Sequence, residues 1–510
     1  MKNIIANRII FLTILTLISA WLVLPYNVNA ESISTSVQSE IDKYVLAKME
    51  ELRIKGASVS IVQGDSILYM KGYGISNNNG DAVTPETPFI LGSTTKSITA
   101  LAVMQLVEAG KVNLDEPVKK YIPEFHLDDN KSSSKITVRH LLNQTSGIPG
   151  TAGNSNYLDD TSTSEDFIKR LSTLTITSAP GKEYQYAEAN YIILGVLISK
   201  VSGQSYEEYI EKSIYKPMDM KHSFTSKNEA VKNKLSTGYR TWFGFPFSSD
   251  FPYPKQYISA SYLISSAEDM AHYLKIYTNN GIYNTTPIIS SSGVAELFNP
   301  GPKLLHPEGY SYSMGWFVSG DYKIHDGRPT NYYSCIVVDA KNKTGVVLLT
   351  NTNNRLVTAE YSMPVAMGIS NIISGKTVET TTWGFREIYL AFNLVLLALV
   401  ITLLIRFILS LTTFRRKLGN RTINSFSKAV RYVITDLLLV TVFTAILLYL
   451  LVSMQISFSI AMLGQPDLVI AFITIIIISA VNLLIKLILI YVYLHRNAKR
   501  ESAMLPSTLE

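Results

Sequence analysis

The sequence predicts a mixed α/β domain that is followed by three transmembrane helices. Strand-like segments lie near both ends of the region from about residue 31 to 375, and apolar helical segments lie between them. The composition changes abruptly after Trp383, where three long apolar stretches follow one another. A chain of 510 residues is too long for one ordinary domain and can bury a sizeable core.

The strand-like segments at the two ends indicate one sheet. Residues 56–62 and 66–70 are rich in apolar and β-branched side chains on either side of a Gly-Asp turn at 64–65, which is typical of a β-hairpin. The runs at 334–338 and 345–349 predict two consecutive strands. We therefore expect a sheet that joins the N- and C-terminal segments of the domain.

Helical segments and loops fill the region between these strands. Residues 97–109 form an apolar helical pattern that ends at Gly110, and residues 191–201 form another that ends near Gly203. The stretch 151–164 is rich in Ser, Thr, Asn and Asp, so it is expected to be a surface loop.

Residues 1–30 have the pattern of a secretory signal peptide. Lys2 and Arg8 form a basic start, residues 9–24 form an apolar segment, and residues 28–30 offer a cleavage site. No cysteine follows the apolar segment, which excludes a lipoprotein anchor. The signal places the following domain, residues 31–375, outside the cytoplasm; the alternative is an uncleaved signal anchor.

The apolar stretches predict spans at 388–411, 433–454 and 468–494, after a linker at 376–387 and before a tail at 495–510. Each stretch is long enough to cross the hydrocarbon core of a bilayer. Three such lengths in succession argue against the alternative of buried helices in a soluble protein.

Positive charges predict the orientation of these spans. The loop at 453–467 contains no Lys or Arg, whereas the loop between the first two spans and the C-terminal tail are basic. The basic residues are Arg415, Arg416, Lys417, Arg421, Lys428 and Arg431 in the loop, and His495, Arg496, Lys499 and Arg500 in the tail. The positive-inside rule puts both segments in the cytoplasm and residue 387 outside, in agreement with the signal peptide.

Three ionisable residues, Arg406, Asp436 and Lys486, lie in or near the predicted spans. Such residues can mark a functional site within a membrane. All three lie towards the cytoplasmic ends of the spans, and we favour side chains that snorkel to the interface over a transport site.

Charge and composition exclude several classes of function. The formal net charge is +6, and much of it lies in the two basic segments near the C-terminus, so no stripe suited to nucleic acid is present. The one cysteine, Cys335, excludes an internal disulfide and a CxxC metal site, and it is expected to be a small buried strand residue. The histidines lack metal-ligand spacing, so we predict neither a metal nor another cofactor.

The candidate nucleophile is Ser93, which with Lys96 forms an S-x-x-K pattern at the start of the apolar helix. Side chains three residues apart lie on one face of a helix, so the lysine amine can approach the serine hydroxyl. A desolvated lysine can take the hydroxyl proton, and a helix N-terminus favours the negative charge that then develops. Taken alone the pattern is weak, because a capping serine with a solvated lysine has the same spacing.

The segment 89–100, which contains this pattern, resembles the nucleophile segment of class C β-lactamases and low-molecular-weight penicillin-binding proteins. Further segments resemble that family in the same order over about residues 45–350. They are Gly110 with 114–118 and 121–123, then 136–142, 145–148, Pro180-Gly181, 186–195, 266–271 and 325–327. With the three spans, the chain resembles the membrane-anchored Flp-like branch of the family and the peptidases that cleave acyl-D-asparagine prodrug segments.

The resemblance implies a fold and a set of site residues. The fold is an antiparallel sheet flanked by helices, and Tyr186 is the second catalytic partner. A phenol is a poor base at neutral pH, and an ammonium such as that of Lys96 would lower its pKa. His325 and Gly327 would lie on an edge strand that faces Ser93, with the glycine allowing a substrate backbone to approach closely.

Two more roles follow from the same resemblance. The backbone N–H groups of Arg328 and Ser93 would bind the oxyanion, and His325 would bind a substrate carboxylate or tune Tyr186. The family has Tyr-x-Asn where this chain has Tyr186-Ala187-Glu188. An ionised Glu188 accepts hydrogen bonds but cannot donate one to a substrate amide. It would favour a substrate ammonium or amide N–H, or face solvent, and efficient β-lactamase activity is not expected.

The sequence thus predicts an extracytoplasmic, membrane-anchored serine hydrolase. We expect it to act on D-amino-acid-containing peptides or related amides and esters, in cell-wall metabolism. The alternatives are a prodrug-maturing D-amino-acid peptidase and a non-hydrolytic receptor for penicillin or wall peptides. The expected partners are a small peptide-like or wall-derived substrate and the lipid bilayer of a bacterial cell membrane, with no nucleic acid.

Specificity is expected to depend on two loops, at 151–165 and 240–258. The second loop contains several aromatic residues, among them Trp242, Phe243, Phe245 and Tyr253. Such side chains could line a cleft or pack in the interior.

Overall fold

The computed structural model describes residues 33–153, 161–300, 309–353, 358–378, 385–419, 426–453, 458, 461–462 and 466–504. The predicted signal peptide at 1–30 lies outside these residues. Parts of the predicted loops at 151–164 and 453–467, of the linker at 376–387 and of the tail at 495–510 also lie outside them.

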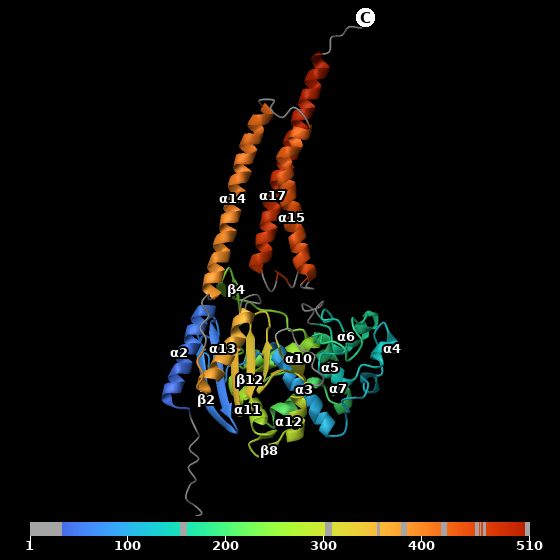
Figure 1. Ribbon diagram of the computed structural model, residues 1–510, viewed down its shortest axis with the longest axis vertical. Coiled ribbons are helices and arrows are strands. Elements are labelled where there is room, and N and C mark those ends of the chain that lie inside the picture. The colour runs from blue at the N-terminus through green and yellow to red at the C-terminus, as the bar shows by residue number, and fades with distance from the viewer. Residues whose placement is uncertain are drawn as a thin grey trace, which may run out of the picture.

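A large antiparallel sheet forms the centre of the soluble domain (Figure 1). Within the described residues it has seven strands in the order β2-β1-β13-β12-β11-β10-β9. The strands are β1 (Gly56–Gln63), β2 (Ser66–Gly74), β9 (Ser311–Ser313), β10 (Trp316–Ser319), β11 (Tyr322–Gly327), β12 (Tyr333–Asp339) and β13 (Thr344–Thr350). Pairing of β1 with β13 joins the two ends of the domain, as the sequence predicts.

The predicted hairpin and strands are confirmed by this sheet. β1 and β2 pair with each other around Gly64, which has a φ of +56° that glycine adopts without strain. β12 and β13 contain the predicted runs at 334–338 and 345–349, and their side chains are buried along their length. Cys335 is a fully buried residue of β12, as expected.

Helices cover both faces of the sheet. On one face, α2 (Thr35–Leu52) and α13 (Thr358–Ile373) enclose a core that includes Ile41, Val45 and Val346. On the other face, α11 (Ala267–Thr278) packs against β1 and β13. A helical lobe continues from this face and contains α3 (Thr95–Glu108) and α7 (Glu188–Ser202), the two apolar helices that the sequence predicts.

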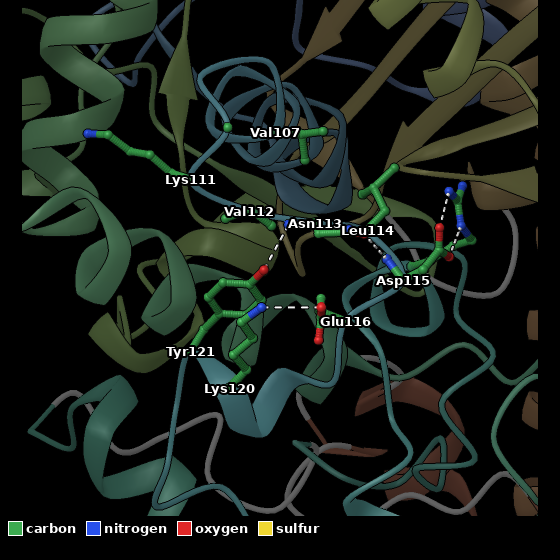
Figure 2. A pocket seen from close by; sticks show the side chains of 11 residues that line it. Val107, Lys111, Val112, Asn113, Leu114, Asp115, Glu116, Lys120 and Tyr121 are labelled. Atoms are coloured by element: carbon green, nitrogen blue, oxygen red, sulfur yellow. Dashed lines mark hydrogen bonds and ion pairs between the residues drawn. The ribbon is translucent and has the colours of Figure 1, made fainter.

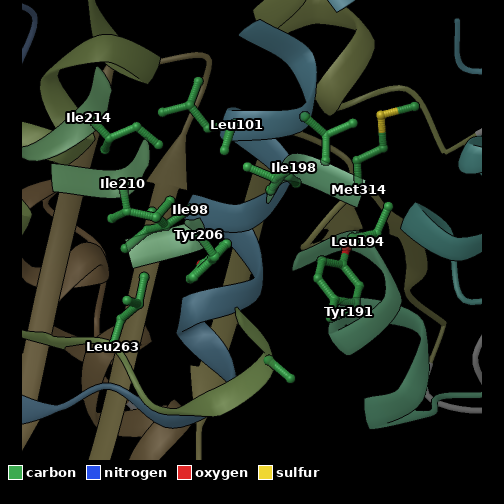
Figure 3. Close-up of a cluster of buried hydrophobic side chains, with 14 of the residues drawn as sticks. Ile98, Leu101, Tyr191, Leu194, Ile198, Tyr206, Ile210, Ile214, Leu263 and Met314 are labelled. Atoms are coloured by element: carbon green, nitrogen blue, oxygen red, sulfur yellow. The ribbon is translucent and has the colours of Figure 1, made fainter. Parts of the chain in front are cut away.

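The core of this lobe forms where α3 meets α7 (Figure 3). Ile98 and Leu101 of α3 pack in one buried cluster with Leu194 and Ile198 of α7, and Leu263 completes it from the segment that follows α10. Apolar side chains surround most of α3, so the helix can only be stable inside the protein. This packing brings the first turn of α3 next to the first turn of α7.

The remaining elements are short. The helices are α4 (Asn130–Ser133), α5 (Val138–Leu142), α6 (Ser164–Arg170), α8 (Tyr206–Ile210), α9 (Lys227–Lys232), α10 (Ile258–Ser261) and α12 (Ser291–Leu297). The strands are β3 (Phe89–Ile90) paired with β6 (Ile264–Ser265), β7 (Ile282–Tyr283) paired with β8 (Thr286–Pro287), and a small sheet of β14 (Thr352–Asn353), β4 (Tyr239–Trp242) and β5 (Phe245–Ser248).

Three long helices extend away from the soluble domain: α14 (Phe385–Gly419), α15 (Phe426–Ser453) and α17 (Pro466–Met504) (Figure 1). Among the described residues these are the helices that are long and apolar enough to cross a membrane, and they overlap the predicted spans. Within their most apolar segments only 6%, 11% and 28% of the residues are buried inside the protein, which is compatible with surfaces that face hydrocarbon.

The prediction that Asp436 and Lys486 snorkel is wrong. The two side chains are buried between α15 and α17 and form an ion pair, with Lys486 Nζ 2.6 Å from Asp436 Oδ2. Asn482 Nδ2 donates to Asp436 Oδ1 over 2.8 Å. Sequence position alone could not show that the two charges face each other across a helix pair. Arg406 is exposed on α14, which is compatible with snorkelling.

Candidate active site

Ser93 lies in a tight turn between a short strand and a buried helix. β3 ends at Ile90, residues Gly92–Thr94 form one turn of 3-10 helix, and α3 begins at Thr95. Gly92 has a φ of +58°, and a Cβ there would lie 2.5 Å from Pro329 Cδ, so only glycine fits. The turn leaves Ser93 partly exposed, while Lys96 in the first turn of α3 is fully buried.

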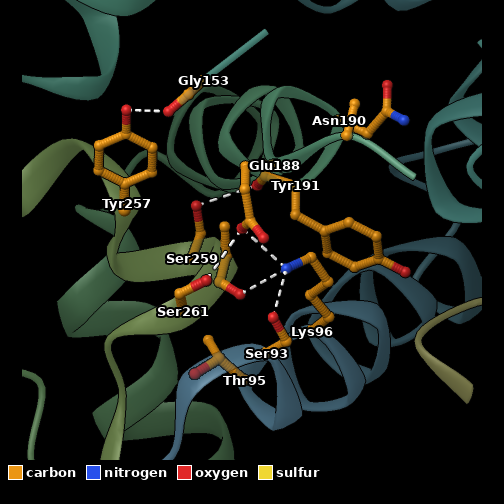
Figure 4. A network of polar contacts seen from close by, with 12 residues as sticks. Ser93, Thr95, Lys96, Gly153, Glu188, Asn190, Tyr191, Tyr257, Ser259 and Ser261 are labelled. Carbon is orange, nitrogen blue, oxygen red and sulfur yellow. Dashed lines mark hydrogen bonds and ion pairs between the residues drawn. The ribbon is translucent and has the colours of Figure 1, made fainter. Parts of the chain in front are cut away.

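The Lys96 ammonium is the centre of a polar network (Figure 4). Its Nζ donates to Ser93 Oγ over 3.2 Å, to Glu188 Oε2 over 2.8 Å and to the carbonyl of Ala260 over 2.9 Å. The three partners come from the turn at Gly92–Thr94, called the nucleophile turn after its candidate nucleophile Ser93, and from α7 and α10. The sequence predicts the contact between Lys96 and Ser93, and the structure places the two side chains within hydrogen-bond distance.

Burial lowers the pKa of Lys96, and the attraction of the Glu188 carboxylate opposes that shift without cancelling it. A lowered pKa makes the neutral amine easier to form. In that form Lys96 can accept the proton of Ser93 Oγ, which lies 3.2 Å away.

Glu188 is buried and does not face solvent, so that alternative is wrong. Its Oε2 pairs with Lys96 Nζ and also accepts from Ser261 Oγ over 2.9 Å (Figure 4). Both contacts are internal to the protein. The carboxylate stands where the resemblance expects an asparagine amide, and its observed partner is Lys96.

Tyr186 lies directly before α7, with its ring beside the ammonium of Lys96. Lys96 Nζ is 4.8 Å from the ring centroid, and the Tyr312 ring packs edge-on at 6.0 Å. Burial raises the pKa of Tyr186 well above its usual value, the Glu188 carboxylate raises it further, and a hydrogen bond with Ser93 acts in the opposite direction. The predicted lowering of this pKa is wrong, because burial of the phenol and the nearby Glu188 carboxylate both disfavour the phenolate. Tyr186 is a phenol at neutral pH.

Buried polar side chains hold the start of α7 in place. Gln144 Oε1 accepts from the backbone N–H of Ala187 over 3.0 Å and from Asn190 Nδ2 over 2.5 Å. Ser146 Oγ donates to Asn190 Oδ1 over 2.6 Å. Gln144 and Ser146, at the start of a segment that resembles a family motif, therefore hold the first turn of α7, which carries Glu188.

Strand β11 carries His325 and Gly327 past the nucleophile turn. The prediction of an edge strand needs correction, because β11 lies between β12 and β10. However, β10 pairs only with residues 322–324 of β11, so residues 325–327 have no strand partner on that side in the described part of the chain. Thr94 Oγ1 and Ser334 Oγ, 2.7 Å apart, link the turn to β12.

Gly327 is required by the protein's own packing. A Cβ at this position would lie 1.8 Å from the carbonyl oxygen of Leu91, which immediately precedes the nucleophile turn. This packing contact alone requires a glycine here, and the expected close approach of a substrate backbone stays a prediction.

We expect Gly327→Ala to push β11 away from the Ser93 turn. The clash with backbone atoms should destabilise the domain by ~1–3 kcal/mol and lower hydrolysis per folded molecule. Urea unfolding followed by tryptophan emission, together with ester hydrolysis, would measure both effects. Gly64→Ala, in the open hairpin turn, is the control for activity: its positive φ costs some stability, but a Cβ there meets nothing within 4 Å, so hydrolysis per folded molecule should not change. Full activity in folded Gly327→Ala would contradict this role.

His325 is a buried, neutral imidazole. Burial lowers its pKa from 6.5 to about 3, and the positive charge of Lys96 contributes to the shift. Its Nδ1 lies 2.7 Å from the carbonyl oxygen of Asp326, which requires the Nδ1–H tautomer. A neutral ring offers no charge to a substrate carboxylate, and the two expected roles of His325, binding that carboxylate or tuning Tyr186, stay predictions.

Arg328 directs its backbone towards the nucleophile turn. Its amide nitrogen lies 2.9 Å from the position that a Cβ of Gly92 would take. Its guanidinium is held aside by Asp326, with Nε 2.5 Å from Oδ2. The Arg328 nitrogen is therefore beside Gly92, which precedes Ser93, and its expected role as one of the two oxyanion donors stays a prediction.

Other family-like segments have structural contacts. Arg139 forms ion pairs with Asp115, 2.7 Å away, and with Glu296.

A surface hollow of about 640 Å³, shown in Figure 2, is lined by Val107, residues 110–116, Lys120, Tyr121 and Arg139. None of Ser93, Lys96 and Tyr186 lines this hollow.

The structure brings together one group of possible metal ligands that the sequence did not predict. Ligand atoms of His222, Glu268 and Asp269 lie within 4.8 Å of one another. The residues come from two separate segments, so ligand spacing along the chain could not reveal the group. Asp269 Oδ2 accepts from the backbone N–H of His222 over 2.7 Å and from Ser223 Oγ over 2.6 Å. These contacts fasten the loop around 222 to α11, and burial raises the pKa of Asp269 to about 6.

Comparisons with known proteins cover the part of the chain that holds Ser93. A family model described as Beta-lactamase matches residues 41–363. Protein flp of Staphylococcus aureus (strain N315) is 28% identical over 379 residues, which are 73% of this chain and 74% of the relative. Putative penicillin-binding protein PbpX of Bacillus subtilis (strain 168) is 29% identical over 317 residues, which are 60% of this chain and 73% of the relative.

Two solved structures share the fold. The octameric penicillin-binding protein homologue from Pyrococcus abyssi superimposes with a TM-score of 0.58 at 30% identity, over 67% of this chain and 78% of that one. EstCE1, a hydrolase with promiscuous acyltransferase activity, gives a TM-score of 0.57 at 18% identity, over 66% of this chain and 98% of that one. The second likeness concerns the fold alone.

Proposed function

The chain belongs to the beta-lactamase family, and from that premise we propose that it is a membrane-anchored, extracytoplasmic hydrolase whose acyl-enzyme forms on Ser93. Serine hydrolases of the β-lactamase and penicillin-binding-protein type make up this superfamily. The observation that carries the proposal is the contact of Ser93 Oγ with a buried lysine that also pairs with Glu188.

The acylation step follows from these contacts. Neutral Lys96 accepts the proton of Ser93 Oγ while the oxygen forms a bond to the acyl carbon of the substrate. The ammonium that results lies 2.8 Å from the Glu188 carboxylate, which stabilises the new charge. The N–H groups of Ser93 and Arg328 bind the negative oxygen of the tetrahedral intermediate.

Tyr186 completes the proton transfers. As a phenol it donates its proton to the leaving nitrogen or oxygen when the bond to the acyl carbon breaks. The resulting phenolate recovers a proton from the Lys96 ammonium, which lies beside its ring. In the second half-reaction water attacks the ester, its proton passes to this pair, and Ser93 Oγ leaves as a hydroxyl.

We expect Tyr186→Phe to slow hydrolysis of amides about 100-fold, because a general acid contributes that much when the leaving group is poor. An activated aryl ester, whose leaving group needs no proton, should lose far less. The ratio of the two rates measures the effect. The control is Tyr184→Phe, which alters a neighbouring ring that packs on Tyr312 at 5.8 Å. Equal losses on both substrates would assign Tyr186 a structural role.

The proposed substrates are D-amino-acid-containing peptides or related amides and esters, with a role in cell-wall metabolism. The similarity to the Bacillus relative, a putative penicillin-binding protein, supports this class. Glu188 argues against ordinary β-lactam substrates, because its carboxylate cannot donate to the acyl-amide group that an asparagine would bind. The three apolar helices support anchoring, and the basic residues of the first loop, among them Arg415 and Arg416, support a cytoplasmic side for that loop.

Covalent labelling tests the nucleophile. A fluorescent phosphonate should label the full-length wild type in membranes and should not label Ser93→Ala. Ser291→Ala, a change at an exposed serine of α12, is the control and should label like the wild type. Equal labelling of Ser93→Ala would overturn the proposal.

Turnover distinguishes a hydrolase from a non-hydrolytic receptor. With an activated ester the protein should release many equivalents of product per site. A burst of one equivalent without further release would support the receptor alternative.

A further inference from the structure

The tip of the β4–β5 hairpin touches the beginnings of two apolar helices. The backbone N–H of Phe243 lies 3.3 Å from Asp467 Oδ2 of α17, and Asn393 Nδ2 of α14 donates to the carbonyl of Phe243 over 2.8 Å. Gly244 packs against the ring of Tyr389, since a Cβ there would lie 3.3 Å from it. Figure 1 shows β4 at the base of α14. The hairpin and the helices are thus in direct contact.

These contacts fix the depth of the hairpin relative to a bilayer. The apolar segments of the two helices run from Tyr389 to Arg416 and from Pro466 to Arg496. Tyr389, Asn393 and Asp467 therefore lie in the first turns of the segments that would enter the hydrocarbon. The hairpin tip touches these residues, so it sits at the level of the lipid headgroups.

The side chains at the tip have the chemistry of a membrane interface. Phe245 is 64% exposed and Trp242 is 41% exposed, although both are large aromatics. Aromatic side chains are enriched at this level of membrane proteins, because one part of the ring system faces hydrocarbon and another faces water. The guanidinium of Arg53 lies 4.6 Å from the Phe245 ring centroid, where it can pair with a lipid phosphate.

We propose that Trp242 and Phe245 form a lipid-contact surface that seats the soluble domain on the outer leaflet. This inference rests on the proposed membrane anchoring and adds a second attachment besides the helices. The sequence left open whether the aromatic residues at 240–258 line a cleft or pack in the interior. Trp242 and Phe245 are exposed, and neither lines the surface hollow shown in Figure 2.

The same hairpin is connected to the candidate active site. β4 pairs with β14, where Thr352 lies opposite Tyr239. Asn353 Nδ2 of β14 donates to the carbonyl of Pro329 over 2.5 Å, and Pro329 packs on Gly92 beside Ser93. β4 has four residues, so it spans about 13 Å between its contact with β14 and the hairpin tip. Seating of the hairpin therefore fixes the height of Ser93 above the bilayer.

Quenching by brominated lipids tests the contact in the full-length protein. The protein is reconstituted in phosphatidylcholine–phosphatidylglycerol vesicles whose acyl chains carry bromine near the headgroup. The emission that disappears in Trp242→Phe should be quenched in wild type by the brominated lipid. A tryptophan introduced as Phe245→Trp should likewise lose most of its added emission.

Ile282→Trp is the matched control. Ile282 is also an exposed apolar residue, at 38%, but it pairs with β8 at the end of the domain away from the helices (Figure 1). Its added emission should be unaffected. Equal quenching at 245 and 282, or none at 242 and 245 in protein that floats with the vesicles, would overturn the lipid-contact surface alone. Protein that does not float would overturn the membrane anchoring as well.

Discussion

Replacing Lys96 with Met is expected to lower hydrolysis about 1,000-fold and to destabilise the soluble domain by ~3–5 kcal/mol. The first effect follows from loss of the group that accepts the Ser93 proton. The second follows because the Glu188 carboxylate, which is buried, would lose its cationic partner. Steady-state ester hydrolysis and urea unfolding, followed by emission of the buried Trp316, measure the two effects.

The double variant Lys96→Met/Glu188→Gln separates them. Removing both charges of a buried pair is often nearly neutral, so the double variant should recover most of the lost stability. It should recover none of the activity, because no proton acceptor is restored. If the double variant is no more stable than Lys96→Met, the pair does not account for the loss.

Lys275→Met is the control for burying a lysine elsewhere. Lys275 is also buried, and its Nζ lies 3.0 Å from Asp65 and 2.8 Å from Asn284 Oδ1, remote in sequence from the site residues. This change should lower stability and leave hydrolysis per folded molecule unchanged. Hydrolysis by Lys96→Met within tenfold of wild type would mean that another group accepts the Ser93 proton.

The sequence predicts the fold well because its strongest signals are local. Strand patterns at 56–70 and 334–349 give the central strands, and apolar helical patterns give α3 and α7. The ordered family-like segments add the antiparallel sheet, which is confirmed. The same segments distinguish Ser93 and Lys96 from the other serines and lysines of the chain. Their contact could be predicted because two residues three positions apart on one helical turn lie on the same face.

The sequence could not reveal contacts that depend on packing between distant segments. Glu188 reaches Lys96 only because α7 lies against α3, and 92 residues separate the pair. Burial of Tyr186, together with this carboxylate, explains why the prediction of a lowered Tyr186 pKa is wrong. Likewise, Asp436 and Lys486 meet across two helices 50 residues apart, and Gly327 is constrained by a carbonyl of Leu91. For Glu188, Asp436 and Lys486, the sequence allowed contact with solvent or the interface where the partner is another part of the chain.

The Lys96–Glu188 pair and the β4–β5 hairpin are expected to affect function in different ways. The pair determines where protons and charge reside during acylation. The hairpin determines where the domain stands relative to the bilayer. Pro329 connects them, because it packs on Gly92 and accepts a hydrogen bond from Asn353 next to β4. Changes at the hairpin tip are therefore expected to alter where the site stands relative to the bilayer, and not the proton transfers within the site.

Acid is expected to destabilise the domain through His325. Its pKa is lowered from 6.5 to about 3 by burial, so the folded protein holds a neutral ring where the unfolded chain binds a proton. The unfolded state therefore gains protons first as pH falls. The stability that the neutral ring contributes is fully present above pH ~6.5 and is lost progressively as pH falls towards ~3.

The expected size of this effect can be measured against His325→Gln, which cannot titrate. Between pH 7 and pH 4.5 the wild type should lose about 3 kcal/mol more than the variant, because each pH unit below the unfolded pKa costs ~1.4 kcal/mol. Urea unfolding at the two pH values gives the difference. His126→Gln, a change at an exposed histidine, is the control and should behave as the wild type. Equal acid losses in wild type and His325→Gln would mean that the imidazole gains a partner for its proton in the folded state, and the neutral-ring description of the site would then be wrong.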